Sequence, residues 1–173
     1  GMMTILVISR WSQIHAELPT IRQLMTPHGV FILGATIVFI KILHEIGHGL
    51  TCHHYGGECH ELGCIVVGFL PLLYCDVSDS WLQRNRMHRI HVAAAGIAVE
   101  LFLAAILGML WLASTPGVPH TFFFNVMLVC SLNTVLVNGN PLLRYDGYFV
   151  LCDLMRIPNL GPESRAAATS VFD

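Results

Sequence analysis

The sequence predicts an all-α membrane protein with a three-span transmembrane core and a short re-entrant strand or hairpin between spans one and two. Hydrophobic residues make up 54% of the 173 residues and charged residues only 12%, a composition outside the usual soluble range. Three stretches are also apolar over about 20 residues, the length that crosses a bilayer as a helix. A fourth apolar stretch is too short to cross.

The chain divides into three expected regions. Residues 1–27 mix polar and apolar positions, contain Pro19 and Pro27, and are expected to form an interfacial lead-in. Residues 28–157 form the expected transmembrane core, and residues 158–173 form a polar tail that would suit the start of a further region. Because the lead-in lacks the basic leading segment of a cleavable signal, we expect the spans themselves to direct membrane insertion.

The first expected span runs from His28 to His48 and carries only Lys41 and Glu45 as strong charges. Its end holds the motif His44-Glu45-Ile46-Gly47-His48. Residues four apart lie on one face of a helix, so both imidazoles can reach a single metal ion. Glu45 then lies beside the site, where it can serve as a general base. The span therefore predicts a catalytic zinc site at a membrane boundary.

The re-entrant segment and the two later spans follow from length and composition. Leu62 to Tyr74 is apolar, but it is only about 13 residues long, so it is tolerated at membrane depth only as a strand or hairpin covered by protein. Residues 76–91 are expected to form a polar loop. The second span, Val92 to Ala113, is interrupted only by Glu100. The third, Thr121 to Asn138, ends in an Asn-Gly-Asn-Pro sequence that breaks a helix.

A hydrolytic zinc site needs a third protein ligand beside His44 and His48. With three spans and one re-entrant hairpin, the first and third helices end on the same side of the membrane, which brings Asp146 within reach. Asp146 is therefore the leading candidate, and Gly147 would let the backbone turn tightly beside the metal. A different membrane zincin arrangement, with Glu61 or Glu100 as the third ligand, stays open.

The charge distribution predicts the orientation of this multi-pass protein in the bilayer. The 76–91 loop and the segments after the third span hold six Arg residues, against Arg10 and Arg22 on the opposite side. The positive-inside rule therefore places the metal motif near the cytoplasmic face.

The formal net charge of −2, without a dense basic tract, gives no reason to expect a nucleic-acid partner. Trp81 and Trp111 are expected to face lipid or the interface.

The HExxH motif together with Asn140-Pro141-Leu142-Leu143-Arg144-Tyr145-Asp146-Gly147 resembles the site-2 protease family of intramembrane zinc metalloproteases. That family pairs HExxH with a later NPxxxxDG-type element, and the resemblance covers residues 28–155. It implies a zinc metalloendopeptidase that hydrolyses peptide bonds of membrane-spanning or membrane-associated polypeptides. The implied Zn²⁺ ligands are His44, His48 and Asp146, with Glu45 as general base. Asn140 would line the cleft and hold the substrate backbone or the developing oxyanion.

Two positions depart from the pattern of that family. Many of its members carry a Gly-Pro-x-x-Asn element in the second span, where this chain has Gly96-Ile97-Ala98-Val99-Glu100. An acidic residue inside a span is a functional candidate, so Glu100 either faces the cleft or pairs with Arg or His across the bundle. Tyr148 stands where members of the family often have a second glycine after Asp-Gly.

Two further interpretations stay open. The chain could be a catalytically inactive metal-binding membrane component of a peptide maturation or export assembly, although such a protein would not need Glu45 as a base. A separate structural zinc site could also use residues 52–60, although their spacing matches no common zinc finger. His88 and His91 are expected to be solvated or to contact headgroups. The six cysteines contain no C-x-x-C pair, and a disulfide framework is not expected.

Overall fold

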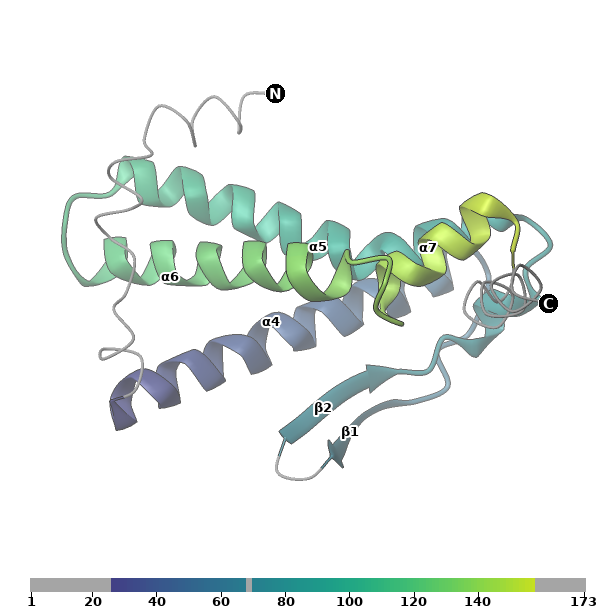
Figure 1. The fold of residues 1–173 in the computed structure, drawn as a ribbon, viewed down its shortest axis with the longest axis horizontal. Helices are drawn as coiled ribbons and strands as arrows, with labels where there is room; N and C mark the ends of the chain where they lie inside the picture. The colour runs from purple at the N-terminus through teal and green to yellow at the C-terminus, as the bar shows by residue number, and fades with distance from the viewer. Residues whose placement is uncertain (1–25, 68–69, 158–173) are drawn as a thin grey trace, which may run out of the picture.

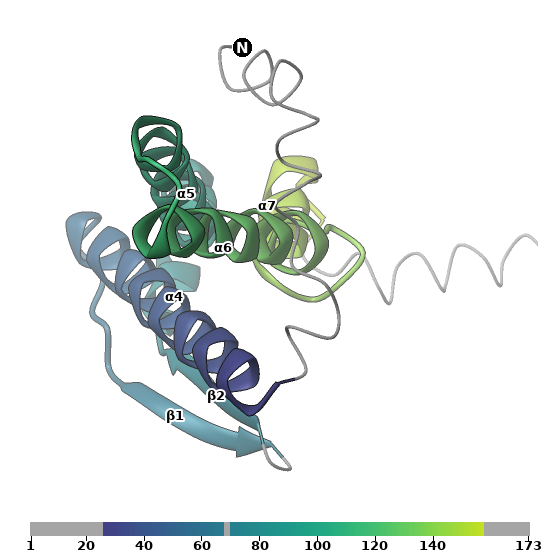
Figure 2. The same cartoon turned by 90° about the vertical axis from the view of Figure 1, so that its left-hand side faces the viewer.

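The fold matches the predicted class in a computed structural model that describes residues 26–67 and 70–157. Three helices are long and apolar enough to cross a membrane, and they lie alongside one another with a hairpin beside the first (Figure 1, Figure 2). The expected tail, and all of the lead-in except its last two residues, fall outside the described residues. In chain order the elements are α4 (Pro27–His54), β1 (Leu62–Val67), β2 (Leu70–Cys75), the 3₁₀-helix η1 (Ser78–Leu82), α5 (Arg86–Ala113), α6 (Val118–Asn133), the π-helical turn η2 (Thr134–Asn138) and α7 (Asp146–Met155).

Helix α4 carries the HExxH motif and is longer than expected. Thr26 caps it by accepting a hydrogen bond from the backbone N–H of Gly29 at 3.0 Å, and Pro27 fits the first turn without losing a helical hydrogen bond. The helix continues past His48 to His54. At a rise of 1.5 Å per residue, the motif therefore lies about 9–15 Å before the helix end.

Strands β1 and β2 form the expected hairpin between the first two spans. They pair antiparallel, with Leu62 opposite Cys75 and Val67 opposite Leu70. The base of the hairpin lies near the end of α4, and its strands run back beside that helix (Figure 1). The chain thus enters and leaves the hairpin at one end of the bundle, which is the re-entrant arrangement that its short length predicts.

The second and third spans begin earlier than expected. Helix α5 starts at Arg86 because the side chain of Asn85 caps it, accepting a hydrogen bond from the N–H of Met87 at 2.9 Å. The polar loop expected over 76–91 is therefore much shorter and includes η1. Helix α6 starts at Val118 and accommodates Pro119 in its first turn.

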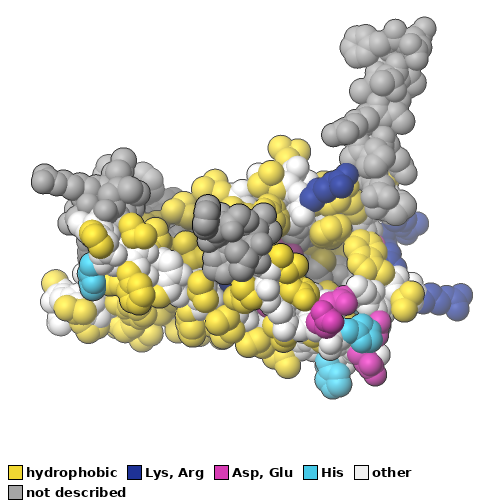
Figure 3. Space-filling model, turned by 90° about the horizontal axis from the view of Figure 1, so that it is seen from below, with side chains coloured by type: hydrophobic (Ala, Val, Ile, Leu, Met, Phe, Trp, Pro, Cys, Tyr) yellow, Lys and Arg dark blue, Asp and Glu magenta, His cyan; other side chains and the backbone are white. Residues whose placement is uncertain are grey.

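The outer faces of the helices are apolar, while the polar side chains gather at one end. In Figure 3 hydrophobic side chains cover most of the visible face, and most of the charged ones lie at one end of the molecule. Phe31, Phe39 and Phe102 are among the exposed large apolar residues, as suits a lipid-facing surface. The expectation that Trp111 faces lipid is wrong: it is 3% exposed and contacts Phe124 inside the bundle.

Helix α7 fixes the position of Asp146, its first residue. Arg89 of α5 donates hydrogen bonds to Oδ1 of Asp153 from Nε at 2.9 Å and from Nη2 at 2.5 Å. At the other end of α7, a Cβ on Gly147 would lie 2.6 Å from the carbonyl carbon and oxygen of Gly139. Glycine is therefore required where the first turn of α7 touches the end of the third span, in agreement with the tight approach expected at Gly147.

We expect Arg89→Ala to loosen α7 against α5. The change removes the partly buried ion pair with Asp153, and charge-assisted hydrogen bonds are worth about 1.5–3 kcal/mol. Amide hydrogen exchange in α7 should therefore accelerate about tenfold or more, measured by mass spectrometry on the detergent-purified protein. Arg84→Ala is the matched control, because Arg84 is exposed and has no ion pair among the described residues. Equal α7 exchange in the two variants would contradict this docking role.

Candidate metal centre

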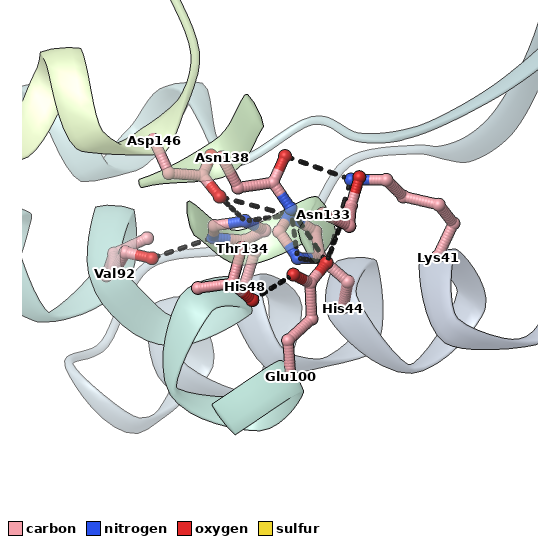
Figure 4. Close-up of polar contacts among 9 residues, drawn as sticks. All are labelled: Lys41, His44, His48, Val92, Glu100, Asn133, Thr134, Asn138 and Asp146. Carbon is pink, nitrogen blue, oxygen red and sulfur yellow. Dashed lines mark hydrogen bonds and ion pairs between the residues drawn. The ribbon is translucent and has the colours of Figure 1, made fainter. Parts of the chain in front are cut away.

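Three metal-ligand side chains from distant parts of the chain meet in one group, formed by His44, His48 and Asp146 (Figure 4). Asp146 Oδ2 lies 3.0 Å from His44 Nε2 and 3.4 Å from His48 Nε2. The two Nε2 atoms are 3.1 Å apart. Ligand atoms placed about 2.0–2.1 Å from a tetrahedral zinc ion are about 3.3 Å from one another. The spacing of the three atoms therefore suits such an ion.

The second nitrogen of each imidazole contacts an oxygen that can only accept a hydrogen bond. His44 Nδ1 donates to Oε1 of Glu100 at 2.9 Å, and His48 Nδ1 donates to the carbonyl oxygen of Val92 at 2.7 Å. Each neutral ring therefore carries its hydrogen on Nδ1 and presents the lone pair of Nε2 to the metal group. Histidines that bind metals are usually held by outer contacts of this kind.

The third member of the group has a buried oxygen without a hydrogen-bond partner. Oδ2 of Asp146 is buried, and its polar neighbours are the Nε2 atoms of His44 and His48, which have no hydrogen to donate in this tautomer. This oxygen faces the Nε2 lone pairs of His44 and His48, so three electron-rich atoms converge with no hydrogen between them. Such an arrangement is costly when buried. A cation among the three atoms removes the cost, and the two imidazole nitrogens with one carboxylate oxygen suit zinc.

Glu100 contacts the ring of His44 and is not part of the metal group. Its side chain is fully buried, and it approaches His44 at Nδ1, on the side of the ring away from the Nε2 atoms (Figure 4). Lys41 Nζ lies 3.7 Å from Glu100 Oε1 and donates to Oδ1 of Asn138 at 3.0 Å. The carboxylate accepts three further hydrogen bonds, from Asn133 Nδ2 at 2.7 Å, Thr134 Oγ1 at 2.5 Å and Asn138 Nδ2 at 2.7 Å.

The π-turn η2 aligns the donors of the third span with Glu100. The N–H of Gly139 bonds to the carbonyl of Thr134 at 2.7 Å, five residues earlier. Residues five apart share a face in this wider turn, so Asn133 and Asn138 both reach the same carboxylate. These donors were not predicted from the sequence, in which Asn138 marked only the end of the third span. Polar side chains inside an apolar span were the signal that could have identified them.

Two glycines bring helices α4 and α5 together at the site. A Cβ on Gly96 would lie 2.3–2.5 Å from three atoms of the His44 ring, so the ring occupies the space that any other residue would need. A Cβ on Gly47 would lie 2.8 Å from Cγ2 of Val99. Gly96 and Glu100 are four residues apart on one helix face. Gly96 leaves space for the His44 ring, and Glu100 accepts a hydrogen bond from it.

Glu45 lies beside the metal group at the wall of a cavity of about 220 Å³. His48 and Asp146 line the same cavity, which is far larger than the volume one water molecule needs. The Glu45 carboxylate is half-buried and has no hydrogen bond or ion pair among the described residues. It is therefore free to exchange protons with a molecule in the cavity.

Asn140 and Glu61 have other contacts in the structure. Asn140 Nδ2 donates to the carbonyl of Leu136 at 3.4 Å, and its Oδ1 accepts from the N–H of Leu142 at 3.0 Å. Asn140 thus shapes the loop that leads to Asp146. Glu61 accepts a hydrogen bond from the hydroxyl of Tyr74 at 3.1 Å on the hairpin and is not part of the metal group.

The separate structural zinc site considered for residues 52–60 is not formed. In residues 26–67 and 70–157, the metal group above is the one cluster of three or more suitable ligands. His60 instead pairs with Asp79 at 3.0 Å, and this hydrogen bond raises the pKa of His60 and lowers that of Asp79. Outside this segment, His88 and His91 contact Tyr55: His88 stacks on its ring, and His91 Nδ1 lies 2.6 Å from its hydroxyl oxygen.

We expect Gly96→Ala to weaken zinc binding at least about tenfold, because the added methyl group takes the space of the His44 ring. Metal analysis and chelator competition on the purified protein measure the affinity, and circular dichroism checks the helices. Gly34→Ala is the matched control on α4, since a Cβ there would meet nothing within 4 Å. Parental zinc affinity in Gly96→Ala would refute the assigned position of His44.

We expect Glu100→Gln to lower zinc affinity about 10–100-fold, the usual cost of losing an outer contact to a metal-bound histidine. The neutral amide lacks the charge that holds His44, and its NH₂ group meets other donors. The same metal analysis applies, with Glu61→Gln as the control that keeps parental affinity. Loss of zinc in Glu61→Gln but not in Glu100→Gln would reverse the two assignments.

Comparison of the chain with protein families, with curated proteins and with solved structures found no match. The function of the protein is therefore inferred from the chemistry of the site. That site is a buried group of His44, His48 and Asp146 that could hold a metal ion, in a protein with three helices able to span a membrane.

Proposed function

We propose that this protein is an intramembrane zinc metalloendopeptidase of the site-2 protease type, acting on membrane-spanning or membrane-associated polypeptides near the cytoplasmic face. One observation carries the proposal: the lone pairs of two oriented imidazoles and an unpartnered carboxylate oxygen converge beside the free carboxylate of Glu45. When bound there, zinc supplies Lewis-acid chemistry, polarising a peptide carbonyl and lowering the pKa of water to about 7.

The charges of the site favour a divalent cation. When ionised, Glu45, Glu100 and Asp146 carry three negative charges against the single positive charge of Lys41, which leaves a net charge of −2. Uncompensated charge is costly at membrane depth. A divalent ion brings the sum to zero, and the two imidazole nitrogens favour zinc over calcium or magnesium, which prefer oxygen ligands.

Residues in and near the cavity have separate roles in amide hydrolysis. Glu45 takes a proton from the attacking water and passes it to the leaving amine. Glu100 and the Val92 carbonyl keep His44 and His48 in the tautomer that binds metal. Asn140 is placed in the loop before Asp146, and its long 3.4 Å bond to Leu136 can be exchanged for one to a substrate carbonyl.

Water and substrate reach the site by different routes in this proposal. The cavity is also lined by Arg89 and Asp153, which suits water entry from the charged end of the molecule rather than from lipid. A helical substrate must unwind before its amide is accessible, and the hairpin beside α4 offers strand edges to pair with the extended segment. The excess of Arg residues in the 76–91 loop and after the third span supports a cytoplasmic location for the site by the positive-inside rule.

We expect Glu45→Gln to retain zinc and to lose turnover by about 10²–10⁴-fold, because an amide cannot take the proton of the attacking water. The probe is a fluorogenic single-span helical peptide, reconstituted with the protein in phosphatidylcholine vesicles. Zinc content is measured in the same samples. Asp146→Ala is the companion variant and should lose both zinc and turnover.

The two variants separate the protease proposal from the ligand assignment. Turnover in Glu45→Gln equal to that of the parent would remove the protease proposal, whatever the metal content. Stoichiometric zinc in Asp146→Ala would instead assign the third ligand to another residue. The inactive-component alternative predicts zinc in the parent and in Glu45→Gln, with no zinc-dependent turnover in either.

A further inference from the structure

We propose that Cys59 and Cys75 form a reversible disulfide bond that closes the base of the hairpin beside the metal centre. Both residues are free thiols, and their Sγ atoms lie 2.9 Å apart. Cys59 belongs to the segment that joins α4 to β1, and Cys75 is the last residue of β2. A covalent bond here would link the two arms of the hairpin where they leave the helices.

The backbone already holds the two arms together at this point. Beyond the strands, the N–H of Asp76 bonds to the carbonyl of Glu61 at 2.8 Å, and the N–H of His60 bonds to the carbonyl of Asp76 at 3.2 Å. Helix α4 packs directly on the thiol pair: a Cβ on Gly49 would lie 3.3 Å from Sγ of Cys75. The sulfur atoms are thus kept in contact by both the hairpin and the helix.

The composition of the cluster favours oxidation over metal binding. A zinc site needs at least three protein ligands, and no third ligand joins these two thiols within the described ranges 26–67 and 70–157. The nearby Cys52 thiol is directed to the carbonyl oxygen of Glu58, at 3.8 Å. The contact between the Cys59 and Cys75 thiols, without a third ligand, therefore suits the reduced form of a disulfide.

A low-molecular-weight disulfide such as glutathione disulfide is the oxidant in this proposal. The Cys59 thiolate attacks one of its sulfurs, forming a mixed disulfide and releasing one glutathione. Cys75 then attacks the Cys59 sulfur and releases the second glutathione. In total, two protein thiols lose two hydrogens and two electrons, and one glutathione disulfide becomes two glutathione molecules.

The order of these steps follows from the surroundings of each thiol. Burial and the hydrogen bond with Cys59 raise the pKa of Cys75 to about 12, so Cys75 is a weak first nucleophile. Cys59 therefore reacts first. The second step is driven by proximity, since the two sulfurs are already in contact and an intramolecular reaction has a high effective concentration.

The bond would act on the wall of the metal cavity. Cys75 lines that cavity together with Glu45 and His48, and β2 packs on α4. Oxidation therefore restricts opening of the hairpin away from the cavity. This inference depends only on the thiols and the hairpin, so it stands or falls separately from the proposed protease activity.

The test uses the full chain in detergent, incubated with glutathione disulfide, alkylated and digested for mass spectrometry. We expect a Cys59–Cys75 cross-linked peptide, while Cys64, which is exposed on the same hairpin, carries glutathione. We also expect hydrogen exchange at the His60 and Asp76 amides to slow at least about tenfold in the oxidised form, because the bond closes the loop that contains the hairpin.

Single serine variants test the order of attack. Cys75→Ser should accumulate glutathione on Cys59, and Cys59→Ser should leave Cys75 as a free thiol; circular dichroism confirms that both variants remain folded. The proposal is overturned if Cys59 and Cys75 of the parent are recovered as alkylated thiols, or as separate glutathione adducts, while Cys64 reacts. A cross-link that leaves the amide exchange unchanged would refute the effect on the hairpin.

Discussion

The contact between Glu100 and His44 is the constraint on which the arrangement of the helices depends. A carboxylate inside a span costs several kcal/mol unless other groups compensate for it. Its partners come from α4 and from the end of the third span, so the three helices must meet at one depth. The same contact directs His44 Nε2 towards Asp146. The same hydrogen bond therefore compensates the buried charge of Glu100 and orients the ring of His44.

Hydropathy and motif spacing predicted most of the fold and the three ligand-type residues. The spans and the hairpin follow from length and composition, because lipid admits few backbone conformations. His44 and His48 follow from their helical spacing, and Asp146 follows from counting membrane crossings. The start of α5 could not be predicted, because it depends on one hydrogen bond that the side chain of Asn85 accepts from the N–H of Met87. The surrounding stretch has the composition of a loop.

Helix α7 and the partners of Glu100 escaped prediction for another reason, since both depend on contacts between distant residues. An Asp-Gly pair usually marks a turn, and α7 is held by the ion pair of Arg89 with Asp153, which are 64 residues apart. Asn133 and Asn138 would not share a face on a regular α-helix. Their common role emerges only with the wider turn of η2.

The wider turn of η2 also sets the direction in which the chain leaves the third span towards Asp146. A π-turn holds one residue more than the α-helical turn it replaces, and each residue of an α-helix advances the chain by about 100° around the axis. Deleting a single residue within η2 would rotate the loop and Asp146 away from the imidazoles while leaving every ligand in the sequence. The insertion or deletion of one residue in this turn would thus form or disrupt the group of His44, His48 and Asp146.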